Sequence, residues 1–553
     1  MPSYSTFDDD DLVPLVRSTS GAGITSETQL ADLGYAQELP RRLSMMSILG
    51  LSFAIMGVPT GLSSTMAIGL TDGQHAGIFW GWVGVSLVSV CIAASLAEIC
   101  SVFPTSGGVY YWSAMLAPHK WAPLASWTAG WLTLVGNWTV TTSICFSGAQ
   151  LLLSSGSLFF PDWEPSALAT VLAFWGVLGA CALANALLAN HHLAALNTVC
   201  IYWTATTVVV VGACLLAWAP EVNAPKVIFT HFDSSLSGWP APIGLLVGSL
   251  QAAYTLTGYG MVASMCEEVQ SPEREVPKGM ILSVVAAGLT GVIFLIPVLA
   301  VLPTDRIAQL LAANDMPVTP MFLMVTGSPV RAQMLLGLLQ GTIVFAGVGS
   351  LTAASRGTYA FARDGAIPGS HRWARVYDGV PVGGLFLSTA VCASLGLVYF
   401  GSRAAFDAFM GSATICLSAS YGLPVAISLF RSRHALAHAP LKLGRFWGPL
   451  ANWVTICWIC LAMVLFSMPV SVPVTAGTMN YASAVFGGFF AIAAGWYVAW
   501  GRTHFHGPPE LVEHYVKSGM GKPEVVEGLE VSVTSGILST SPSPSSSSSL
   551  LRK

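Results

Sequence analysis

The chain has 553 residues, of which 54% are hydrophobic and only 9% are charged. A soluble domain carries about 25% charged residues, so this composition excludes a soluble enzyme of this length and indicates a protein of the lipid bilayer. The net charge of −4 argues against a nucleic-acid partner. We find no cluster of metal ligands and no nucleophile beside a base in the sequence, so no metal, cofactor or enzymatic activity is predicted.

Twelve apolar segments follow a polar N-terminal region, residues 1–43, which predicts a disordered tail without a cleavable signal. Each segment is long enough to cross a bilayer as a helix, which takes roughly 20 residues. The predicted spans are 44–70, 76–101, 121–155, 166–186, 193–218, 242–266, 279–302, 332–361, 381–400, 404–430, 449–469 and 481–501. The Ser/Pro-rich end of the chain predicts a second disordered tail over residues 502–553.

Lysine and arginine residues are concentrated in alternate loops, which predicts the orientation of the protein in the membrane. If the N-terminus is cytoplasmic, the outer loops receive only Lys226, Arg306, Arg331 and Arg403. The inner loops then receive Arg41, Arg42, Lys120, Arg274, Lys278, Arg363, Arg372, Arg375, Arg431, Arg433, Lys442 and Arg445. We therefore expect an integral multi-pass protein with both termini in the cytoplasm.

The first span contains helix-breaking residues at mid-membrane depth, Gly57-Val58-Pro59-Thr60-Gly61. Glycine removes the Cβ penalty of unusual backbone conformations, and Pro59 has no N–H and blocks a continuous helix. The half-helix that restarts here would present N–H groups and a positive dipole end to a carboxylate. The alternative is an ordinary proline kink.

The sixth span contains a matching interruption, Tyr254-Thr255-Leu256-Thr257-Gly258-Tyr259-Gly260. Freed carbonyls here can accept an ammonium group, and a tyrosine face can hold a cation. The alternative is an aromatic-rich packing seam. Unpaired backbone at membrane depth is tolerated only where it lines a cavity, and in inverted-repeat transporters that cavity is the substrate site. Pairing spans one and six predicts two inverted repeats, 44–218 and 242–430, followed by two extra spans in 449–501.

Other polar residues within or beside the spans are candidates for gating or binding. Glu98 lies near the inner end of span two, where we expect a gate ion pair with Arg356 or Arg363. Gly107 and Gly108 predict a hinge or a close approach of the backbone to a neighbouring segment, with a simple tight turn as the alternative. Asn137 in span three could donate to a substrate or bond a neighbouring helix.

Three segments resemble motifs of the amino acid–polyamine–organocation permeases. The first is Glu267-Glu268 with Ser271-Pro272-Glu273-Arg274 and Val276-Pro277-Lys278; the second runs from Ser95 to Trp112, and the third from Ser355 to Pro368. They occur in the expected order within residues 40–505. The chain is most similar to the fungal branch that transports GABA, choline and related amino acids, and Tyr254-Thr255-Leu256-Thr257-Gly258-Tyr259-Gly260-Met261 favours the GABA permease-like members.

The resemblance implies an all-α, five-plus-five inverted-repeat fold and import of a small amino compound by alternating access. It places the substrate at the two breaks, with spans three, eight and ten completing the pocket, and Glu267, Glu268, Arg356 and Arg363 at the inner gate. The expected substrate is GABA or a related amino acid, imported with protons across the plasma membrane, with exchange and facilitated entry as alternatives to proton coupling. Alternatives are choline held by an aromatic cage of Tyr254, Tyr259 and Trp138, and a transporter-like nutrient sensor. Pro59 leaves fewer N–H donors than relatives have, and the oligomeric state stays open.

Overall fold

The computed structural model describes Leu30, Leu33 and residues 35–160, 162–188, 192–313, 316–401, 403–431, 433–437, 439–475 and 479–509. This part of the chain is helical throughout and contains no β-strand, only two isolated β-bridges. The all-α prediction is therefore confirmed.

The helices follow in this order: α2 (Met45–Met56), α3 (Val58–Ser64), α4 (Met66–Asp72), α5 (Gln74–Val102), α6 (Val109–Leu116), η2 (His119–Trp121), α7 (Ala122–Gly156), α8 (Ala167–Leu188), α9 (Leu193–Trp218), α10 (Pro225–Thr230), α11 (Ala241–Gly248), α12 (Leu250–Leu256), η3 (Met261–Glu268), α13 (Pro272–Val301), α14 (Ile307–Ala313), α15 (Val318–Thr326), α16 (Pro329–Arg363), α17 (Ser370–Trp373), α18 (Val382–Gly396), η4 (Leu397–Phe400), α19 (Arg403–Phe430), η5 (His434–Leu436), α20 (Trp447–Leu465), α21 (Ala482–Trp496), η6 (Tyr497–Gly501) and α22 (Arg502–His504).

Ten helices within the described residues are long and apolar enough to cross a membrane. The two remaining predicted spans are α7, whose 35 residues are about 50 Å long but rich in Gly, Ser and Thr, and the sixth span. The sixth span is divided into α11, α12 and η3, so no single piece is long enough. The twelve predicted crossings therefore all fall on helical segments.

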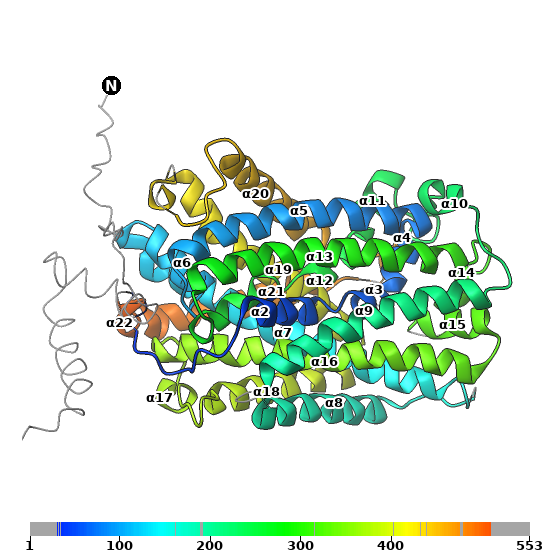
Figure 1. Ribbon diagram of the computed structural model, residues 1–553, viewed down its shortest axis with the longest axis horizontal. Helices are drawn as coiled ribbons and strands as arrows, with labels where there is room; N and C mark the ends of the chain where they lie inside the picture. Colours follow the sequence, from blue (N-terminus) through cyan, green and yellow to red (C-terminus); the bar gives the residue numbers. More distant parts are fainter. Residues whose placement is uncertain are drawn as a thin grey trace, which may run out of the picture.

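The long helices lie side by side, and short helices cover the two ends of the bundle. In Figure 1, α5, α13 and α16 run along the long axis. One end carries α6, α17 and α22, and the other carries α10, α11 and α14. We call these the α6 end and the α11 end. In the most apolar 18-residue window of the first span 78% of the residues are buried, against only 6% in that of the last span. The first span therefore lies in the core and α21 at the periphery.

The helix lengths recur in the order expected of a five-plus-five repeat. Spans two and seven, α5 and α13, have 29 and 30 residues, and spans three and eight, α7 and α16, have 35 each. α5 and α13 also pack closely: a Cβ at Gly291 would lie 2.1 Å from the Trp82 ring, whose Nε1 donates to Gly288 O at 2.9 Å.

The predicted N-terminal tail is wrong for residues 35–43, which pack against the α6 end. Leu39 and Leu43 are buried, and Leu43 pairs with Val269 just after η3. The cause is an apolar spacing within a polar segment, since Leu30, Leu33 and Tyr35 are buried too. The C-terminal tail prediction is likewise wrong near its start, because Phe505 is buried. Residues 1–29 and 510–553 of the two predicted tails lie outside the described residues.

Candidate functional site

The first break is narrow and is made by Gly57. Its φ of +41° and ψ of 51° end α2 in a left-handed conformation, which glycine adopts without a Cβ penalty. Pro59 has no N–H for Ile55 O, and Thr60 N–H donates to Gly57 O at 2.9 Å. The carbonyls of Ile55 and Met56 therefore lose the donors that a continuous helix would supply.

The second break is wider and leaves four residues, 257–260, outside any helix. Thr257 is extended and Gly258 has a φ of +119°, a conformation that other residues rarely adopt. The chain resumes as the 3₁₀ helix η3. The hydroxyls of Thr255 and Thr257 donate back to Gln251 O and Ala253 O of the preceding turn, so their lone pairs face outward as acceptors.

The two breaks line one cavity in the centre of the bundle. Its volume is about 30 Å³, and its predicted lining residues are Gly57, Thr60, Gly61, Tyr254, Thr255 and Thr257. The sequence interpretation did not single out the others: Ile55, Met56 and Ser64, with Val140, Ile144 and Ser147 from α7, and Ile343 and Ala346 from α16. The Tyr254 hydroxyl is buried beside Ser143 of α7 and forms no well-aligned hydrogen bond within the described residues. A space of this size holds about one water, so a larger molecule enters only when the breaks separate.

Five predicted site residues lie elsewhere. Val58 and Pro59 are buried in α3 but do not line the cavity, and neither does Gly258, whose missing Cβ would meet Ile55 Cγ2 at 2.7 Å. Tyr259 packs against Tyr421 of α19, with ring centroids 5.5 Å apart. Span ten therefore packs against the second break, and none of its described residues lines the cavity, contrary to expectation.

Asn137, the fifth, lies in a second cavity of about 30 Å³ closer to the α6 end. Gly107 and Gly108, before α6, line the same cavity, together with Gly260, Met261, Ala263 and Ser264 of the broken span. The Asn137 Oδ1 atom is buried without a partner within the described residues. Gly108 has a φ of +51°, and a Cβ there would lie 3.0 Å from Ala263 Cβ. Both the backbone conformation and the close approach therefore require a glycine.

Buried ion pairs close the α6 end below these cavities. Arg356 Nε donates to Glu268 Oε1 at 2.6 Å, with the arginine side chain only 1% exposed. Arg363 Nη1 and Nη2 donate to the two oxygens of Glu267 at 3.0 and 2.9 Å. Such bidentate pairs are geometrically specific, and removing one partner leaves a buried charge. The pairs tie η3, after the second break, to the last two turns of α16.

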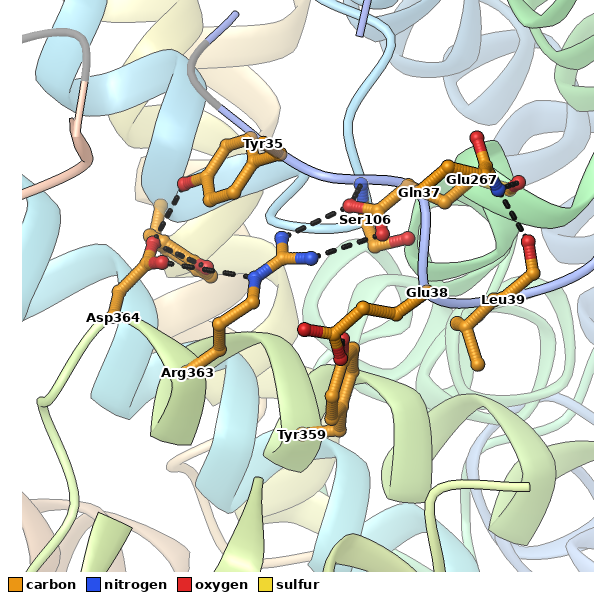
Figure 2. Close-up of polar contacts among 10 residues, drawn as sticks. Tyr35, Gln37, Glu38, Leu39, Ser106, Glu267, Tyr359, Arg363 and Asp364 are labelled. Atoms are coloured by element: carbon orange, nitrogen blue, oxygen red, sulfur yellow. Dashed lines mark hydrogen bonds and ion pairs between the residues drawn. The ribbon is translucent and has the colours of Figure 1, made fainter. Parts of the chain in front are cut away.

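Residues 35–38 extend this network from the N-terminal side (Figure 2). The Tyr35 hydroxyl donates to Asp364 at 2.8 Å, and its ring lies 4.0 Å from the Arg363 guanidinium. The Tyr359 hydroxyl donates to Glu38 at 2.6 Å. Burial raises the pKa of Asp364 to about 6, against the opposing effects of Arg363 and the tyrosine hydroxyls. The N-terminal segment is therefore part of the closed end and not a free tail.

The predicted partner of Glu98 is wrong. Glu98 pairs with Arg433, beyond α19, and also accepts from Leu443 N–H at 3.2 Å. Arg356 and Arg363 are occupied by Glu268 and Glu267. Sequence reasoning missed Arg433, Asp364, Tyr35 and Glu38, because nothing local in the sequence indicates which distant charges meet.

Comparison with known proteins decides the family. The model of the family described as amino acid permease matches residues 43–490, most of the chain. The chain belongs to the amino acid permease family. Its relatives are transporters, so the protein is a membrane permease and not an enzyme.

Its relatives differ in the cargo their names give. This permease is 36% identical to the polyamine transporter TPO5 of Saccharomyces cerevisiae, over 86% of this chain and 78% of that protein. It is 34% identical to the amino-acid permease BAT1 of Arabidopsis thaliana, over 90% and 98%. It is 28% identical to the choline transporter of Saccharomyces cerevisiae, over 85% and 83%.

Proposed function

We propose that this permease imports a small amino compound, GABA or a related amino acid, by proton-coupled alternating access at the plasma membrane. The observation that carries the proposal is the central cavity, where the breaks in spans one and six face each other. Substrate binds there, and the closed α6 end is the cytoplasmic gate.

The amine end of the substrate binds the carbonyls freed at the first break. Ile55 and Met56 line the cavity, and their carbonyl oxygens are deprived of helical donors. An ammonium group offers donors to such oxygens, and it is better paired there than in an apolar pocket. The described residues that line the cavity include no acidic side chain, so these dipoles are the receptor.

The carboxylate end binds the Tyr254 hydroxyl. This group is a buried donor without a well-aligned partner in the described structure, and an O–H bonded to a carboxylate is a strong, charge-assisted hydrogen bond. Thr60 on α3 lies in the same cavity near the positive end of that short helix. The cavity therefore offers separate receptors for the two ends of an ω-amino acid.

A quaternary amine such as choline is the second candidate, supported by the related choline transporter and the freed carbonyls. It is less well supported because only Tyr254 of the expected aromatic cage lines the cavity. Tyr259 packs against Tyr421, and Trp138 Nε1 donates to Ser388 on α18. A polyamine fits less well, since the lining residues that the structure describes include no carboxylate for a second ammonium group.

The test is uptake of labelled GABA, choline, spermidine and arginine in permease-null yeast, with and without a protonophore. We expect GABA uptake that the protonophore abolishes. Choline or spermidine uptake without GABA uptake would replace the substrate assignment. Binding of GABA without flux of any of the four would indicate a sensor.

The variant Tyr254→Phe tests the carboxylate receptor. Loss of one hydrogen bond to a charged group costs about 1.5–3 kcal/mol, so the KM for GABA should rise by roughly 10- to 100-fold. Because choline has no carboxylate, its inhibition of GABA uptake should be the same in the variant as in wild type. Tyr421→Phe is the matched control, because Tyr421 Oη is also buried without a well-aligned partner in the described structure but lies outside the cavity. Equal losses in the two variants would contradict the assignment.

A further inference from the structure

Asp72 is a buried carboxylate at the α11 end that no ion pair explains. It is the last residue of α4 and is fully buried. Neither of its carboxylate oxygens has a hydrogen-bond partner within the described residues. A buried polar group without a partner is rare enough to require an explanation.

The short helix α11 of the broken sixth span packs directly on Asp72. A Cβ at Gly248 would lie 2.9 Å from Asp72 Cβ, and one at Gly244 would lie 2.8 Å from Asp72 O. Both glycines are therefore needed for this close approach. Figure 1 shows α4 and α11 together at the end of the bundle opposite α6. The outer pieces of the two broken spans thus meet at this carboxyl group.

The ionisable groups around Asp72 are engaged elsewhere. α11 has no titratable residue, and Tyr254 of α12 lines the central cavity. His75 of α5 contacts Leu302 O at 3.0 Å, and His231 contacts Gln74 Oε1 at 3.2 Å. Asp233 accepts from Gln74 and Ser235, and Lys226 lies on the exposed face of α10. The Ser237 hydroxyl nearby donates to Ser234 O.

With no cation opposite it, Asp72 is buried at far lower cost as the neutral acid. Burial raises the pKa of Asp72 from 3.8 to about 7, against the opposing effect of the nearby Ser237 hydroxyl. Separation of α4 and α11 would return the carboxyl to water and to its ordinary pKa.

We propose that Asp72 is a proton-binding site, and that a proton must occupy it for α4 and α11 to close against each other. This protonation controls how α4 and α11 pack at the α11 end. In the transport cycle, external acidity would then favour closure of the outer gate over bound substrate, and this consequence alone rests on the proposed function.

The direction of the pH effect follows from linkage. The closed state has the higher pKa, so closing takes up a proton at any pH between about 4 and 7. The ratio of closed to open molecules therefore falls about tenfold per pH unit in that range. Below it both states are protonated and above it both are ionised, so the ratio levels off.

Hydrogen exchange of the full-length protein in lipid nanodiscs, without substrate, tests the site. We compare wild type with Asp72→Asn, a neutral isostere, at pH 5 and pH 7, and use amides of α13 as the internal reference. In α4 and α11, the exchange rate of wild type relative to the variant should rise at least about tenfold between the two pH values. Asp233→Asn, which removes a half-buried carboxylate of the adjoining loop, should behave as wild type.

Equal pH dependence of wild type and Asp72→Asn would overturn the proposal, and so would the same change in Asp233→Asn. If Asp72→Asn does not fold, the wild-type rates in α11 relative to α13 decide alone: a ratio independent of pH contradicts the site. The measurement needs no transported substrate, so a failure to find GABA uptake leaves its result intact.

Discussion

At the scale of single residues, the close approach of the two broken spans at the central cavity depends on Gly61. A Cβ there would lie 2.5 Å from Thr255 Cγ2 and 2.7 Å from its Oγ1. No side chain fits between the breaks while they are closed, and the cavity is correspondingly small.

Gly61→Ala should therefore lower the initial rate of uptake at least tenfold, because the extra methyl group holds the breaks apart and misplaces the substrate. Gly61→Ala/Thr255→Ala should recover part of the activity, since it removes the two nearest atoms. Gly84→Ala, at a glycine with open space around it, is the control. Failure of the double variant to exceed the single one would mean that the contact does not limit transport.

The residues at the breaks were predictable because glycine and proline have local effects. Gly57, Pro59 and Gly258 disrupt a helix whatever surrounds them. The lining from α7 was not predictable, since helix rotation decides whether Asn137 or Ser147 faces the cavity. Asp72 was missed for a related reason: in sequence it is an ordinary acidic residue at the end of a span, and only the packing of α11 makes it unusual.

At the scale of elements, the 3₁₀ helix η3 is joined to the end of α16 by two buried ion pairs. Both pairs connect spans six and eight, so movement of one span at the α6 end either carries the other along or breaks the pairs. The motif Glu267-Glu268 indicated a gate, but its partners required the fold, because each pair joins residues about 90 positions apart in the chain.

Glu268→Gln should destabilise the protein by roughly 3–5 kcal/mol, because Arg356 would remain buried without a counter-charge. The double variant Glu268→Gln/Arg356→Met should be more stable than the single one. Thermal unfolding in detergent measures both. Glu275→Gln, which breaks the more exposed pair with Lys278, should shift the midpoint far less. A midpoint for Glu268→Gln equal to that of the control would show that the pair does not hold the end closed.

At the scale of the whole molecule, both ends of the bundle are closed around a cavity of about 30 Å³. The α6 end is held by buried ion pairs and by the N-terminal segment, whereas the α11 end is held by helix packing around Asp72 and by hydrogen bonds such as that of Gln74 with Asp233. Different chemistry at the two ends allows each to be released by a different event. Alternating access adds one requirement, that weakening one end must favour closure of the other.

The double variant Tyr35→Phe/Glu38→Gln tests this requirement away from the cavity. It removes one of the two tyrosine hydroxyls that donate to Asp364, and it removes the anionic acceptor of Tyr359, so it weakens the α6 end without creating a large void. We expect hydrogen exchange in η3 to increase, while exchange in α11 at the far end decreases as molecules shift toward the state open at the α6 end. Tyr377→Phe, at an exposed tyrosine, should change neither. Faster exchange at both ends would mean that the N-terminal segment only stabilises the fold, because a true alternation moves the two ends in opposite directions.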